Sequence, residues 1–110
     1  MDAHPIGLGH RWPCVGSPDD QMYSCGAEGS VSLLGAVDGS QVATGAPEGP
    51  VMLHLTVCPA HVREVRRWLR AKTPFPEDVQ TWKTAVLMEQ WGQVEDAMQD
   101  TPIYSMQRAS

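Results

Sequence analysis

The feature that most constrains the fold of this 110-residue chain is a strand pattern that runs directly into a cysteine, a proline and a histidine. In residues 51–57, VMLHLTV, apolar residues occupy every second position, which predicts a β-strand with one buried face. Pro59 suits the first turn of a helix, where its missing N–H needs no partner. With Cys58 as N-cap and His61 as third helical residue, the two side chains converge, which predicts two metal ligands.

Two further cysteines, Cys14 and Cys25, precede this strand. An odd count of three, in a chain without a secretory signal at its start, argues against a framework of disulfides alone. Cys25 is followed by Gly26, which lets backbone amides turn back toward the sulfur. Cys14 is the expected remaining ligand of the metal. The loop between Cys14 and Cys25 costs little entropy to close, since each doubling of loop length costs only ~0.6 kcal/mol. The alternative fourth ligands are His10, Asp19 and Asp20.

His54 is not expected to join this site. It stands four residues before Cys58, and four residues of extended strand span about 13 Å. Both side chains cannot reach one ion without a bend in the strand.

The order of these features resembles a treble-clef zinc finger over about residues 14–72: a cysteine knuckle, a β-hairpin, then a helix whose first turn carries two ligands. The resemblance implies a structural Zn²⁺ site formed by Cys14, Cys25, Cys58 and His61. It also implies a role in binding protein or nucleic acid. The first knuckle departs from the family's pattern, because Met22 stands where a second cysteine is expected.

Around this site the sequence predicts an α+β fold with a small sheet. Residues 31–37 have a strand pattern, and the Asp38-Gly39 pair after them favours a hairpin whose return strand covers 41–44. Residues 1–30 show no sustained period and are expected to wrap on the core as an irregular arm.

Two helices are expected after the second strand. The first spans 59–72 and buries one apolar face. The second, longer helix spans 76–98 and carries an apolar arc of about half its circumference, wider than one neighbour needs. The arc consists of Val79, Trp82, Val86, Leu87, Trp91, Val94 and Met98.

The zinc-binding hairpin and helix are thus expected to occupy residues 1–74, with residues 75–110 packed on them in a single domain. We expect Val79, Trp82 and Val86 to pack on the zinc module. The remainder of the arc is then free for self-association or a partner, with Trp91 as its anchor.

Four arginines gather on one side of the first predicted helix, at positions i, i+3, i+4 and i+7. Planar guanidinium groups suit phosphate binding, so this face predicts a surface for a partner. The alternative is a solvated face that pairs with the acidic residues of 76–100. The four are Arg63, Arg66, Arg67 and Arg70.

Composition and motifs exclude several classes of protein. With 42% hydrophobic residues and a net charge of −5, the chain is neither disordered nor a globally basic nucleic-acid coat protein. It has no glycine-rich phosphate loop, nucleophile elbow or HExxH pair, so we expect no enzyme. The alternative is a catalytic Cys58 thiolate with His54 or His61 as base.

The sequence therefore predicts a small intracellular, cytoplasmic module that zinc stabilises and that acts by binding. The expected partner is a protein or a second copy of the chain. The alternative is DNA or RNA on the arginine face. No membrane and no small-molecule substrate are expected, because no run of 18 apolar residues and no catalytic motif occurs.

Overall fold

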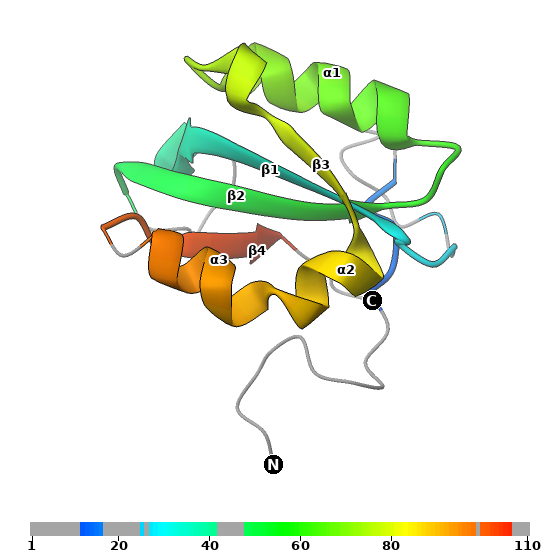
Figure 1. The fold of residues 1–110 in the computed structure, drawn as a ribbon. Coiled ribbons are helices and arrows are strands. Elements are labelled where there is room, and N and C mark those ends of the chain that lie inside the picture. Colours follow the sequence, from blue (N-terminus) through cyan, green and yellow to red (C-terminus); the bar gives the residue numbers. More distant parts are fainter. Residues whose placement is uncertain (1–11, 17–24, 26, 42–47, 99, 107–110) are drawn as a thin grey trace.

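A four-stranded mixed sheet lies at the centre of the molecule, with strands in the order β3-β1-β2-β4 (Figure 1). The computed structural model describes residues 12–16, 25, 27–41, 48–98 and 100–106. Its elements are β1 (Val31–Asp38), the 3-10 helix η2 (Gly39–Gln41), β2 (Pro50–Val57), α1 (Val62–Lys72), the 3-10 helix η3 (Pro76–Asp78), β3 (Gln80–Lys83), α2 (Thr84–Glu89), α3 (Trp91–Ala97) and β4 (Ile103–Met106).

The two long strands β1 and β2 form an antiparallel hairpin, paired from Val31 opposite Val57 to Asp38 opposite Pro50. The strands predicted at 31–37 and 51–57 are confirmed, but the partner of β1 is β2 and not a return strand at 41–44. Gln41 lies in η2, and residues 42–44 lie outside the described part of the chain.

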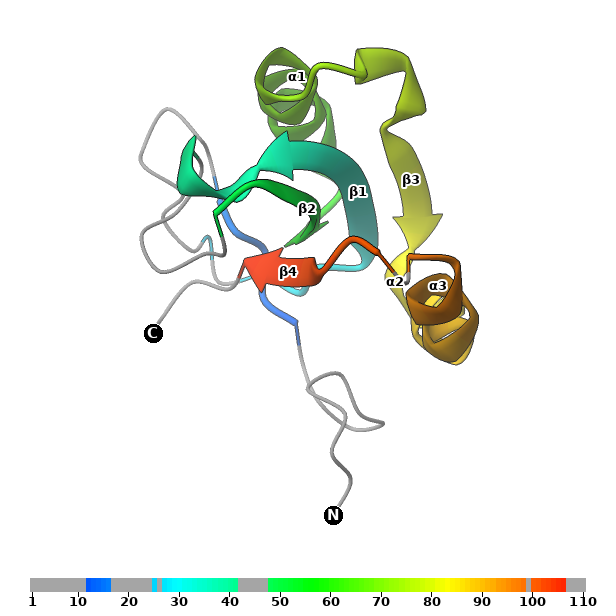
Figure 2. The same ribbon diagram turned by 90° about the vertical axis from the view of Figure 1, so that its left-hand side faces the viewer.

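Successive side chains of the hairpin point to opposite faces of the sheet. Both faces are buried, because helices cover each of them (Figure 2). On one face α1 packs over a core of aliphatic side chains and two cysteines. On the other face α2 and α3 pack over a smaller, aromatic core. The first core includes Leu33, Val51, Leu53, Leu55, Val57, Val65 and Leu69, and the second consists of Trp12, Leu34, Leu87 and Trp91.

Helix α1 confirms the first predicted helix but begins later. Residues 59–61 form a turn, and His61 is the N-cap in place of Cys58. Val65 and Leu69 are fully buried against the sheet. The approach is close at Gly35 of β1, where an added Cβ would stand 3.1 Å from the Leu69 side chain.

The prediction of one long helix over 76–98 is wrong. That segment divides into η3, β3, α2 and α3. Strand β3 pairs antiparallel with β1, from Lys83 opposite Val31 to Gln80 opposite Leu34. Residues that the apolar spacing assigned to a helix therefore form an edge strand of the sheet. After β3, the Thr84 backbone N–H donates to the Ser30 carbonyl (2.9 Å) as α2 begins.

Strand β4 has no counterpart in the sequence predictions. It lies parallel to β2 on the edge of the sheet opposite β3, with Met52 opposite Ile103 and Leu55 opposite Met106. The domain is therefore a mixed α+β structure, as expected in class, with a larger sheet than a lone hairpin. Within the described residues, no helix has both the length and the apolar character to cross a bilayer.

Candidate metal centre

Cys14 reaches the site from residues 12–16, which are hydrogen-bonded to Thr56 near the end of β2. The Cys14 N–H donates to the Ala27 carbonyl (2.9 Å), and the Val15 N–H donates to the Thr56 carbonyl of β2 (3.0 Å). The Thr56 hydroxyl donates in turn to the Pro13 carbonyl (2.8 Å). These bonds tie residues 12–16 to the sheet and fix the position of Cys14.

Two further groups come from the turn between β2 and α1, where the sequence predicted them. The His61 N–H donates to the Cys58 carbonyl (3.0 Å), which closes a tight turn. This turn brings the Cys58 Sγ to 3.3 Å from the His61 Nδ1, although the helix itself begins only at Val62.

All four ligand atoms of Cys14, Cys25, Cys58 and His61 lie within 4.8 Å of one another. The Cys14 Sγ is 3.5 Å from the His61 Nδ1, and the Cys25 Sγ is 3.8 Å from the Cys58 Sγ. In a tetrahedral site with metal bonds of about 2.3 Å to sulfur and about 2.0–2.1 Å to nitrogen, two sulfurs stand about 3.8 Å apart and a sulfur and a nitrogen about 3.6 Å. The three separations given above are near these values, so the four side chains could hold a four-coordinate ion.

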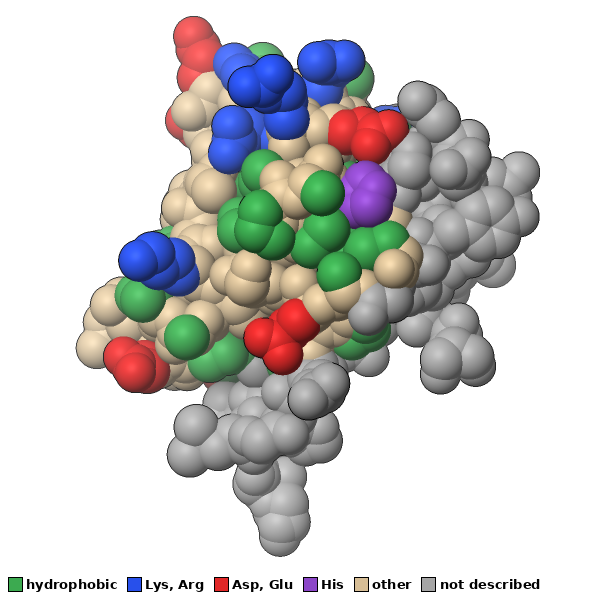
Figure 3. All heavy atoms as spheres, turned by 90° about the vertical axis from the view of Figure 1, so that its right-hand side faces the viewer, with side chains coloured by type: hydrophobic (Ala, Val, Ile, Leu, Met, Phe, Trp, Pro, Cys, Tyr) green, Lys and Arg blue, Asp and Glu red, His purple; other side chains and the backbone are tan. Residues whose placement is uncertain are grey.

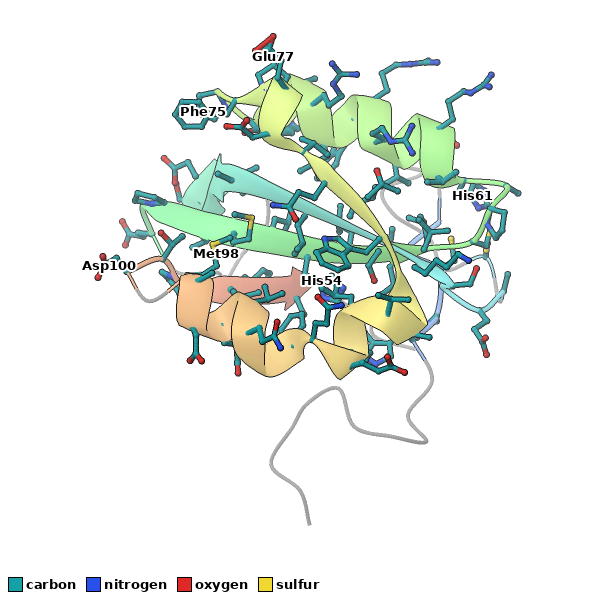
Figure 4. The ribbon with its side chains drawn as sticks, viewed as in Figure 1. His54, His61, Phe75, Glu77, Met98 and Asp100 are labelled. Carbon is teal, nitrogen blue, oxygen red and sulfur yellow. The ribbon has the colours of Figure 1, made fainter. Side chains whose placement is uncertain are left out.

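The thiols are not paired as a disulfide. All three cysteines are free, and 3.8 Å between Cys25 and Cys58 sulfurs is well beyond the S–S bond of about 2.05 Å. Cys14 and Cys58 are buried, His61 is half-buried and Cys25 is exposed (Figure 4 labels His61). The site thus lies at the surface, with one side open at Cys25.

Two neighbouring thiols differ in acidity. Burial raises the pKa of Cys14 to about 11, and backbone N–H donors only partly oppose this. Burial also raises the pKa of Cys58, but hydrogen bonds from His61 and the Ala60 backbone outweigh it and bring the pKa to about 7. A cation bound among these sulfurs favours the thiolates and releases the remaining protons.

The structure also agrees with the exclusion of His54. Its imidazole lies inside the domain, with Nε2 3.1 Å from the Ser32 hydroxyl and Nδ1 3.0 Å from the Ser105 hydroxyl (Figure 4). The alternative ligands His10, Asp19 and Asp20 lie outside the described residues.

The arginine face lies on α1, away from the sheet. The space-filling view shows these cations together on the outer side of α1 (Figure 3). With Ala71 they line a shallow hollow of about 440 Å³. The Nε of Arg66 is buried and has no hydrogen-bond partner among the described residues. The alternative, in which the arginine face pairs with acidic residues of 76–100, does not hold for Glu89, Glu95 and Asp96, because α2 and α3 cover the opposite face of the sheet.

Trp91 does not lie on a free surface. Its side chain is only 3% exposed and packs in the second core with Leu87. Val94 packs against the same core, so the broad apolar arc is largely used within the chain. Val86, which we expected to pack on the zinc module, is instead exposed.

One polar cluster escaped the sequence analysis. Ser32 and Thr84 share a hydrogen bond of 2.9 Å, and Ser32 connects onward to His54. The indole rings of Trp12 and Trp91 flank the His54 ring, at 5.7 Å and 5.3 Å between centroids. A histidine inside the strand pattern of 51–57 was the available signal, but its partners come from distant segments.

The comparisons with known proteins found no relative. No protein-family model, no curated protein and no solved structure matches this chain. The site must therefore be interpreted from its own geometry.

Proposed function

We propose that this protein is a zinc-stabilised binding module with a treble-clef-like Cys3His site, whose arginine face binds the phosphates of nucleic acid. Thiolate and imidazole ligands in tetrahedral arrangement suit Zn²⁺. With Cys14, Cys25, Cys58 and His61 all bound, no position remains for a reacting water, so the metal is structural. It joins the segment before β1 to the start of α1.

The observation that carries the binding function is the arginine hollow on α1. Four guanidinium groups converge on one surface of α1, where with Ala71 they line the hollow. Charged guanidinium N–H groups on this surface would each bind an anionic oxygen in the hollow through a charge-assisted hydrogen bond. Phosphate offers such oxygens in the geometry that guanidinium binds best.

The second candidate is a protein partner with exposed carboxylates. Guanidinium groups also bind carboxylates through two hydrogen bonds, so the same hollow supports this alternative. The other route to a protein partner, through the apolar arc around Trp91, loses its support because Trp91 is buried.

The test is fluorescence anisotropy of the full zinc-loaded chain with labelled DNA and RNA at about 50–200 mM salt. We expect affinity to fall at least tenfold over this range, since several phosphates are contacted. Arg66→Gln and Arg70→Gln should each weaken binding and reduce the salt slope by about one.

Lys83→Gln is the matched control, because Lys83 is an exposed cation on β3 outside the hollow. If no nucleic acid binds at 50 mM salt while polyglutamate does, the protein-partner candidate replaces this proposal. Equal losses for Lys83→Gln and Arg66→Gln would show that only net charge matters and would also overturn it.

A further inference from the structure

Phe75 is an unusual residue in this molecule. It is the only phenylalanine of the chain, yet its side chain is 57% exposed. Among the described large hydrophobic residues, only Val86 is also exposed, at 38%. A large aromatic ring left in water is more typical of a contact surface than of a core.

The backbone holds this ring in place. Pro74 and Pro76 flank Phe75 and restrict the chain on both sides. The Phe75 N–H donates to the buried Thr73 hydroxyl (3.1 Å), and its carbonyl accepts from the Asp78 N–H (2.9 Å). The ring is therefore presented on an ordered turn, which lowers the entropy cost of using it for binding.

The position of Phe75 relates it to the arginine face. It follows α1 directly, five residues after Arg70, and Figure 4 shows it projecting outward beyond the C-terminal end of that helix. Exposed carboxylates of Glu77 and Asp78 stand next to it in the chain. They repel a phosphate at this end, so the group that fits over Phe75 is a base and not the nucleic-acid backbone.

We propose that the arginine face takes a single-stranded nucleic acid, with its phosphates on the guanidinium groups and an unpaired base stacked on Phe75. This inference rests on the proposed nucleic-acid function. Single-strand binding combines a cationic track for the backbone with an aromatic platform for bases. A duplex keeps the faces of its internal bases stacked on one another, so Phe75 discriminates between the two forms.

The experiment compares the zinc-loaded full chain with a single strand of about 12 nucleotides and with the duplex of the same sequence, by anisotropy at one salt concentration. We expect Phe75→Ala to weaken single-strand binding about tenfold, since a stacked base is worth ~1–3 kcal/mol. Duplex binding should change less than about twofold. Phe75→Trp should bind the single strand at least as tightly as the wild type, and Phe75→Leu should behave like Phe75→Ala.

Val86→Ala is the matched control, because it removes the other exposed hydrophobic side chain from α2, across the sheet from α1. The strand also carries 2-aminopurine, whose fluorescence is quenched on stacking. Quenching by the wild type and Phe75→Trp but not by Phe75→Leu supports the inference. Arginine-dependent binding that Phe75→Ala leaves unchanged overturns this inference alone, whereas absence of binding to either form overturns the proposed function as well.

Discussion

The imidazole of His54 on β2 and the hydroxyl of Ser105 on β4 are joined by a hydrogen bond of 3.0 Å. The direction of this bond follows from its neighbours. The Thr84 hydroxyl donates to the Gly29 carbonyl, so it accepts from Ser32, which in turn accepts from the His54 Nε2–H. Burial lowers the pKa of His54, so its imidazole is neutral and its Nδ1 is left as the acceptor for the Ser105 hydroxyl.

This arrangement predicts a loss of stability in acid. Burial lowers the pKa of His54 from 6.5 to about 4, so below pH 6.5 the unfolded chain binds a proton that the folded chain refuses. The contribution of the neutral His54 to the free energy of unfolding is fully present above pH 6.5. It decreases as pH falls toward 4, by about 3 kcal/mol in total. Urea unfolding at several pH values measures it.

His54→Gln is the control, because acid also protonates the cysteine ligands of the metal site. That effect is common to the wild type and the variant, so the difference between them isolates His54. The variant should be less stable than the wild type at pH 7. The difference between the two free energies of unfolding should become smaller as pH falls. Parallel stability curves for the two proteins would contradict a neutral buried imidazole.

Metal removal should unfold the domain. Structural zinc supplies ~10–16 kcal/mol in small domains, so we expect one zinc per chain by mass spectrometry and a collapse of the thermal transition with chelator. His61→Ala and Cys58→Ser should lose the metal, whereas His61→Cys should retain it because four thiolates also bind zinc. Metal-free protein that melts at the temperature of the untreated sample would refute the structural role.

Two glycine substitutions should act in opposite directions. At Gly29 an added Cβ would stand 2.6 Å from the Thr56 Cβ and 2.7 Å from the Trp12 carbonyl oxygen. Gly29→Ala should therefore cost about 1–3 kcal/mol. Gly92 lies in α3 with open space around its Cα, so Gly92→Ala should stabilise by about 0.5–1 kcal/mol. Thermal melts of the two variants distinguish strain at Gly29 from a general effect of alanine.

Replacement of Trp91 should affect folding more than association. Trp91→Ala empties part of the second core and should cost about 3–5 kcal/mol by urea unfolding. Trp91→Phe should cost less, because the Nε1 of Trp91 has no hydrogen-bond partner to lose among the described residues. If Trp91→Ala kept full stability but dissociated an oligomer in sedimentation, Trp91 would be an interface anchor after all.

The sequence predicted those parts of the structure that rest on local patterns. The alternation of 51–57 predicted strand β2 correctly, but the single buried face that it implied was wrong, because β2 lies in the middle of the sheet with helices on both faces. The spacing of Cys58 and His61 fixed half of the metal site, since a tight turn brings residues three apart together. The N-cap was predicted at Cys58 but is His61. This error did not affect the site, because a first helical turn and the observed tight turn both bring the Cys58 and His61 side chains together.

The failures involve pairing between distant segments. Val79, Trp82 and Val86 have helical spacing, but β3 is only four residues long and exists because β1 offers it an edge. Strand β4 pairs with β2, although α1, η3, β3, α2 and α3 lie between them in the sequence. Its four residues are too few to show an apolar alternation. The partners of His54 were hidden for the same reason.

The placement of helices on opposite faces of the sheet also separates charge. The arginines lie on α1, while Glu89, Glu95 and Asp96 lie on α2 and α3 across the molecule. Under the proposed function, the arginine face would meet a polyanion first, although the chain as a whole carries a net charge of −5. The carboxylates of α2 and α3 would then face away from that polyanion, so one molecule would offer it a single binding face.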